Sequence, residues 1–159
     1  MEADALKKIS SGINLLVVED ENDVQKYLVK FLSRFFDNID TAENGAEALE
    51  KYKNKKYDIV ITDIKMPKMD GLSLISEIRE IDKNQPIIVL SAHNDSDILI
   101  ELLNDGVSGF ILKPIAMNKV LQSLLRVCTT LHEKKMLIYY VQEMERLQAE
   151  LAAMQSCPI

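Results

Sequence analysis

The sequence predicts an α/β protein in which five parallel strands form one doubly wound sheet with helices on both faces. Short apolar segments of strand type alternate with segments of helical periodicity from residue 13 to about residue 132. The strand segments are nearly continuous runs of β-branched and aliphatic residues, as expected for strands covered on both faces. Five such strand–helix units in a row are typical of a parallel sheet, because parallel neighbours need a crossover connection.

The individual elements follow from local composition. We expect strands over residues 13–18, 38–41, 58–62, 86–90 and 109–112, of which the second is the weakest. After each strand, apolar residues recur at intervals of three and four, the spacing of one helix face. We expect helices over about residues 24–35, 46–52, 72–81 and 97–104 and from residue 117 onward. Gly106 is expected to end the fourth helix, because glycine tolerates a left-handed backbone.

The last segment differs from the others in length and pattern. From Met117 to about Gln155 the chain contains no Gly or Pro. A single helix here would be roughly 58 Å long at 1.5 Å per residue, more than twice what a five-unit domain can cover. Its second half must therefore leave the domain. Apolar residues alternate there at steps of three and four, which predicts a coiled-coil seam: Leu137, Tyr140, Met144, Leu147, Leu151 and Met154.

The apolar residues upstream of the seam follow a different register, so we expect a discontinuity near residues 137–141. Parallel self-association is expected, because an isolated helix this apolar is poorly stable. A passive linker to an output domain is the alternative. The predicted organisation is a leader over residues 1–12, a domain over residues 13–132 and a helical coiled-coil extension or linker over residues 133–159.

The composition favours a globular protein and excludes several functional classes. Of the 159 residues 47% are hydrophobic and 28% are charged, and the net charge is −6. The longest apolar run, Met136–Val141, is far shorter than the roughly 20 residues of a membrane-spanning helix. Nucleic-acid-binding modules usually carry the opposite charge. Cys128 and Cys157 lie far apart without metal-ligand spacing, so we expect neither a disulfide framework nor a zinc site, and a cytoplasmic location.

Polar residues stand at the carboxyl ends of four predicted strands, the edge at which ligands of such sheets bind. Glu19 and Asp20 follow the first strand, and Asp63, Ser91 and Lys113 follow the third, fourth and fifth. Three carboxylates would repel one another strongly in a medium of low dielectric constant. A divalent cation together with Lys113 balances their charge, which predicts a Mg²⁺ site with oxygen ligands.

The sequence around these residues excludes neighbouring chemistries. A flavodoxin would need a hydroxyl-rich phosphate loop where this chain has three consecutive acids, and a phosphatase of the haloacid dehalogenase type would need Asp-x-Asp where it reads Asp63-Ile64-Lys65. No glycine-rich Walker or dinucleotide loop is present. The remaining candidate is Asp63 as a carboxylate nucleophile for phosphoryl transfer. Lys113 would pair with the phosphoryl oxygens, and Ser91 would donate a hydrogen bond to one of them.

Four blocks, in order at the predicted strand ends, carry a resemblance to one family. They are Val17–Glu21, Asp58–Gly71, Ile88–Ala92 and Gly109–Pro114. Together they resemble the receiver domain of two-component response regulators, over about residues 13–132. The resemblance implies a flavodoxin-like fold and a role in phosphorelay signal transduction.

The resemblance also implies a site. Asp63 would accept a phosphoryl group from a histidine kinase or a histidine phosphotransfer protein. The ligands of Mg²⁺ would be Glu19, Asp20, Asp63 and the backbone carbonyl of Lys65.

A conformational switch is implied as well. Ser91 and Phe110 would form a switch pair, in which the hydroxyl moves toward the phosphate and the ring turns inward. Ordinary core packing is the alternative for Phe110, because aromatic rings fill such positions regardless of switching. The Lys113–Pro114 peptide bond would be cis. Glu19 and Ser91 stand where the family more often has Asp and Thr.

We therefore expect a phosphoacceptor signalling protein, with only self-directed phosphorylation and dephosphorylation, and not an enzyme acting on an external substrate. A phosphate-independent dimerising scaffold or adaptor is the alternative, and a small-molecule phosphatase with an aspartate nucleophile is a third possibility. The expected partners are the kinase or phosphotransfer protein and a second copy of the chain, paired through the C-terminal helix. Neither nucleic acid nor a membrane is expected as a partner.

Overall fold

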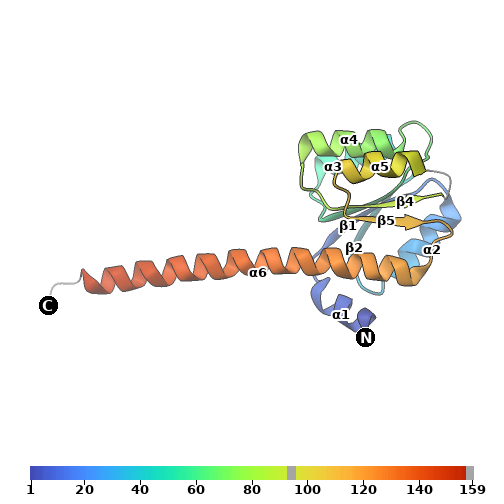
Figure 1. The fold of residues 1–159 in the computed structure, drawn as a ribbon. Helices are drawn as coiled ribbons and strands as arrows, with labels where there is room; N and C mark the ends of the chain where they lie inside the picture. Colours follow the sequence, from blue (N-terminus) through green and yellow to red (C-terminus); the bar gives the residue numbers. More distant parts are fainter. Residues whose placement is uncertain (93–95, 157–159) are drawn as a thin grey trace.

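Five parallel strands form one sheet in the order β2-β1-β3-β4-β5 (Figure 1). The computed structural model describes residues 1–92 and 96–156. The strands are β1 (Asn14–Val18), β2 (Asn38–Ala42), β3 (Ile59–Asp63), β4 (Ile87–Ser91) and β5 (Gly109–Leu112). Each begins and ends within one residue of its predicted range, so the predicted doubly wound sheet is confirmed.

Helices cover both faces of the sheet, as predicted. In the described part of the chain they are α1 (Glu2–Ile9), α2 (Asn22–Leu32), α3 (Gly45–Asn54), α4 (Gly71–Ile81), α5 (Ser96–Asn104) and α6 (Met117–Gln155). One hydrophobic cluster joins the sheet to α1, α2 and α6, and a second joins it to α3, α4 and α5 (Figure 1). The two faces of the central strands are therefore both buried, which explains their nearly continuous apolar composition.

The helix after β1 is shorter than its apolar spacing predicted. α2 ends at Leu32 and is followed by a turn, so the prediction that it reaches residue 35 was wrong. Phe35 lies in that turn and still packs against the same hydrophobic cluster as α2, with 5.5 Å between the centroids of its ring and that of Phe31. A residue can thus keep the apolar spacing of a helix face after the helix itself has ended.

The N-terminal residues, predicted only as a leader, form a helix that belongs to the core. α1 contacts α6, and Leu6 is fully buried in the cluster between the sheet, α2 and α6. The hydroxyl of Ser10 donates a hydrogen bond to the carbonyl of Phe35 (2.5 Å) and so ties the end of α1 to the turn after α2. Leu6 and Ile9 are the only large apolar residues of α1, too few to produce a detectable helical period.

Truncation of Leu6 should test the docking of α1. Leu6→Ala is expected to lower the free energy of unfolding by about 2–5 kcal/mol, the usual cost of a buried leucine truncated to alanine. Lys7→Ala, at an exposed position of the same helix, should change it by less than about 0.5 kcal/mol. Urea unfolding curves of the two variants and the wild type give the comparison. Equal curves for both variants would show that α1 is not docked.

α6 is one uninterrupted helix of 39 residues. Its first part packs on the sheet through buried residues, which are Val120, Ser123, Leu124, Val127 and Cys128. From residue 132 onward no described residue is buried, and the helix projects from the domain as predicted (Figure 1). Because the helix is continuous through residues 137–141, the discontinuity predicted there is not a break in the helix. Residues 157–159 of the predicted extension lie outside the described residues.

Among the described residues, no helix combines the length and the apolar character that a membrane span requires.

Candidate functional site

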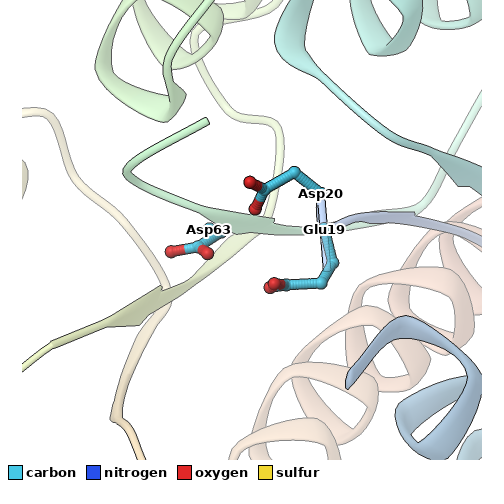
Figure 2. Close-up of side chains that lie close together, drawn as sticks. All are labelled: Glu19, Asp20 and Asp63. Carbon is cyan, nitrogen blue, oxygen red and sulfur yellow. The ribbon is translucent and has the colours of Figure 1, made fainter. Parts of the chain in front are cut away.

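Three carboxylates meet at the carboxyl edge of the sheet. β1 and β3 are neighbours, with Val18 opposite Thr62, so the residues that follow these two positions lie side by side. Glu19, Asp20 and Asp63 each place a carboxylate oxygen within 4.8 Å of the others. Figure 2 shows the three side chains directed to the same side of the strand ends.

Lys113 supplies a positive charge to this cluster from the end of β5. Its Nζ donates a hydrogen bond to Oδ2 of Asp63 (2.7 Å) and lies 3.3 Å from each carboxylate oxygen of Glu19. The Lys113–Pro114 peptide bond is cis, as the resemblance implied. The backbone N–H of Lys113 donates to the carbonyl of Ser91 (2.7 Å), which connects the end of β5 to the end of β4.

The electrostatics of the cluster follow from burial and from like charge. Burial, followed by the charge of Asp63, raises the pKa of Glu19 to about 7, although the Lys113 ammonium acts in the opposite direction. Burial by itself would lower the pKa of Lys113, but its hydrogen bond to Asp63 and the charges of Asp63 and Glu19 outweigh this effect, so its pKa lies above the usual value. One ammonium faces three carboxylates, so the cluster keeps an excess of negative charge.

The donor set fits a hard divalent cation such as Mg²⁺. Mg²⁺ prefers oxygen ligands and is usually held by one or two carboxylates together with phosphate oxygens and water. Glu19, Asp20 and Asp63 offer carboxylate oxygens at a mutual spacing that one ion could bridge.

Close contacts with backbone atoms of residues 63–69 leave room only for glycine at two positions, one in α4 and one in α3. A Cβ on Gly71 would lie 2.1 Å from the carbonyl oxygen of Asp63, and a Cβ on Gly45 would lie 2.4 Å from the carbonyl oxygen of Met69. Oδ1 of Asp63 accepts a hydrogen bond from the N–H of Ile64 (2.8 Å). The sequence does not reveal this packing at either glycine, because a close approach between backbones leaves no signal beyond the glycine itself.

The comparisons with known proteins agree with this geometry. The model of the response regulator receiver domain family matches residues 15–125. The chain belongs to this family. The receiver domain is 38% identical over 117 residues to the chemotaxis protein CheY of Thermotoga maritima, an alignment that covers 73% of this chain and 98% of that protein. It is 36% identical over 111 residues to CheY of Bacillus subtilis, covering 69% and 92% of the two chains.

Solved structures show the same fold. A response regulator receiver domain protein from Clostridium thermocellum superposes with a TM-score of 0.71 at 27% identity, over 79% of this chain and 98% of that one. A crystal structure of a CheX–CheY–BeF3–Mg complex from Borrelia burgdorferi matches with a TM-score of 0.68 at 42% identity, over 72% and 88% of the chains. The family match ends within α6, so the projecting half of that helix lies outside it.

The remaining predicted site residues of the receiver domain surround the cluster at different depths. Ser91 is fully buried at the end of β4, one residue beyond Leu90, which is the register partner of Asp63. Phe110, in β5, is half-buried and packs against the cluster of side chains that involves α3, α4 and α5. Lys65 is exposed, two residues after Asp63. The switching of Ser91 and Phe110 and the ligand role of the Lys65 carbonyl stay predictions.

Substitution of Gly71 should test the close packing behind Asp63. Gly71→Ala is expected to lower the free energy of unfolding by about 1–3 kcal/mol, because the added methyl overpacks the segment. Ser73→Ala, at an exposed position of the same helix, is the control. Urea unfolding curves give the comparison, and wild-type stability of Gly71→Ala would contradict the close contact with the Asp63 carbonyl.

Proposed function

We propose that this protein is a response regulator that receives a phosphoryl group on Asp63, in a Mg²⁺-dependent reaction, from a histidine kinase or a histidine phosphotransfer protein. The observation that carries the proposal is the placement of three carboxylates and Lys113 at one edge of the sheet. The membership of the chain in the receiver family supports the same reaction. A cytoplasmic location goes with it, because the spacing of the two cysteines does not indicate a disulfide framework.

The metal would be held by Glu19, Asp20, Asp63 and the backbone carbonyl of Lys65. When bound, Mg²⁺ would supply positive charge that offsets the repulsion between the carboxylates and the phosphoryl oxygens. Glu19 also pairs with Lys113, so it would hold both the metal and the ammonium in position.

The hydrogen bonds of Asp63 indicate what must change during the transfer. Oδ1 is held by the backbone N–H of Ile64 and Oδ2 by Lys113. A carboxylate oxygen of Asp63 forms the new bond to phosphorus, while the bond between phosphorus and the donor histidine nitrogen breaks. Lys113 has a flexible side chain, whereas the N–H of Ile64 is part of the backbone. Lys113 would therefore leave Oδ2 and bind a phosphoryl oxygen, where its charge stabilises the developing negative charge.

The response to the phosphoryl group would begin at Ser91. The Ser91 hydroxyl would turn toward a phosphoryl oxygen, and the half-buried ring of Phe110 on the neighbouring strand would move inward. Hydrolysis of the acyl phosphate by water would end the signal. This chemistry is confined to the protein itself, which distinguishes it from a phosphatase that turns over small molecules.

A phosphate-independent scaffold is the alternative to this function. The fully buried Glu19 and the ion pairs of Lys113 argue against it. A buried charged cluster usually contributes little net stability, so its presence is better explained by a reaction than by folding.

The phosphoacceptor is tested directly by intact-protein mass spectrometry after incubation with acetyl phosphate. One phosphoryl group is expected on the wild type with Mg²⁺, and none on Asp63→Asn or without Mg²⁺, because only the Asp63 carboxylate offers the nucleophile. Beryllofluoride, a mimic that is not hydrolysed, controls for rapid dephosphorylation. An adduct on both proteins, or neither an adduct nor a beryllofluoride response in the wild type, would contradict the proposal.

The second part of the proposal is a homodimer formed through α6. The six seam residues predicted from the sequence are all between 51% and 74% exposed. If Leu137, Met144 and Leu151 occupy the a positions of a heptad repeat, Tyr140, Leu147 and Met154 occupy the d positions. The flanking residues are then Met136, Glu143 and Glu150 at g, and Val141, Gln148 and Gln155 at e.

The flanking residues favour parallel pairing. In a parallel pair each g residue faces the e residue of the next heptad in the second copy. Met136 would then face Val141, and Glu143 would face Gln148. In an antiparallel pair, g residues face each other, and Glu143 would oppose Glu150 of the second copy.

Arg146 lies between the two glutamates at the g positions. It forms ion pairs with Glu143 and Glu150 of its own helix. The hydrogen bond from Arg146 lowers the pKa of Glu143, so this carboxylate is ionised at neutral pH. Arg146 offsets part of the repulsion in an antiparallel pair, but one arginine pairs with two glutamates, so a net negative charge remains on each helix.

Two neighbouring substitutions should test the seam. Leu137→Glu is expected to raise the dissociation constant of the dimer at least about tenfold, corresponding to about 1.4 kcal/mol, because it places a charge at an a position. Ile138→Glu is the matched control, since Ile138 is similarly exposed (58% against 64%) but lies outside the seam. Sedimentation velocity over a concentration series measures both. Equal effects of the two variants, or a monomeric wild type, would rule out this interface.

A further inference from the structure

Gln25, in α2, connects the ends of two strands directly beside the carboxylate cluster. Its side-chain Nε2 donates one hydrogen bond to the carbonyl of Glu19 (3.0 Å) and another to the carbonyl of Ala42 (3.1 Å). The same Ala42 carbonyl accepts the backbone N–H of Glu19 (3.1 Å), and the backbone N–H of Gln25 donates to the carbonyl of Glu21 (2.9 Å). The side-chain amide of Gln25 thus joins the ends of β1 and β2, and its backbone N–H anchors the residue in the first turn of α2.

The bond to Glu19 controls the peptide on which Asp20 is mounted. The carbonyl of Glu19 belongs to the peptide unit that joins Glu19 to Asp20, and a peptide unit is planar. A donor that fixes this carbonyl therefore fixes the orientation of the whole peptide, including the Cα of Asp20 from which the side chain leaves the backbone.

Asp20 depends on this backbone more than the other two carboxylates do. Glu19 and Asp63 are held directly by Lys113. Within the described part of the chain, the carboxylate of Asp20 makes no hydrogen bond or ion pair that would orient it. Its position in the cluster is consequently set by the peptide that Gln25 holds.

We propose that Gln25 is a positioning residue for the metal-binding carboxylates: its amide orients the Glu19–Asp20 peptide so that Asp20 faces Mg²⁺. This inference rests on the proposed function of the same site. A neutral amide suits the task, because it offers two N–H donors to two carbonyls without adding a positive charge that would repel the cation. Residues that orient metal ligands in this way typically contribute 10–100-fold to metal affinity.

The test compares Gln25→Met with the wild type. Methionine keeps the length and the neutral charge of glutamine and removes both donors. Calorimetric titration of the unphosphorylated protein with Mg²⁺ should show a dissociation constant raised about tenfold. The Mg²⁺ concentration for half-maximal labelling by acetyl phosphate should rise by the same factor, whereas labelling at saturating Mg²⁺ should return to the wild-type level. A merely structural role would lower thermal stability and would not raise the Mg²⁺ concentration for half-maximal labelling while leaving labelling at saturating Mg²⁺ unchanged.

Two further variants make the outcome decisive. Gln25→Ala also lacks the amide and favours the helix, so it should reproduce the effect and replaces Gln25→Met should that variant fold poorly. Gln122→Met, at an exposed position of α6, should bind Mg²⁺ like the wild type. Binding within twofold of the wild type in both Gln25 variants would overturn the inference, as would labelling that stays low at saturating Mg²⁺. A wild type that is not labelled on Asp63 would instead overturn the proposed function. The calorimetry distinguishes the two failures, because it measures Mg²⁺ binding to the unphosphorylated protein and does not depend on labelling.

Discussion

The balance of charge at the carboxyl edge of the sheet is the constraint on which the site depends. Glu19 and Asp63 are buried at strand ends, and an unpaired buried carboxylate costs free energy of folding. Lys113 hydrogen-bonds to both from the end of β5, which β4 separates from β3, so its side chain must reach across the end of β4. The strand order that brings these ends together is therefore as necessary to the chemistry as the residues themselves. The charge left uncompensated is one that a bound cation would balance.

Much of this arrangement could be predicted from the sequence, for a physical reason. Strands buried on both faces produce continuous apolar runs, and the residue that follows each run must lie at one edge of a parallel sheet. The proximity of Glu19, Asp63 and Lys113 follows from these two facts. What could not be predicted depends on backbone contacts between distant segments. The hydrogen bonds of Gln25 end on main-chain carbonyls, and the space beside Gly71 is occupied by a main-chain oxygen, so neither leaves a residue pattern.

The two terminal helices differ in how far the sequence predicts them. α1 is held mainly by the burial of Leu6 in a cluster that also contains residues of the sheet, α2 and α6. Local periodicity cannot report a contact of this kind. α6, by contrast, was predicted over its whole length, because the absence of Gly and Pro and the change in apolar spacing are both local properties. Its two halves have different surroundings, one packed on the sheet and one exposed along its seam.

The continuity of α6 gives the domain a mechanical property. Residues 132–155 extend roughly 36 Å beyond the last contacts with the sheet, at 1.5 Å per residue. A helix without an internal break behaves as a lever whose short arm is packed against β5, the strand that carries Phe110 and ends at Lys113. A tilt of about 5° at the short arm would displace the far tip by about 3 Å, given that length. A rearrangement at the strand ends that is too small to alter the fold would thus be amplified into a displacement comparable to half a helical turn.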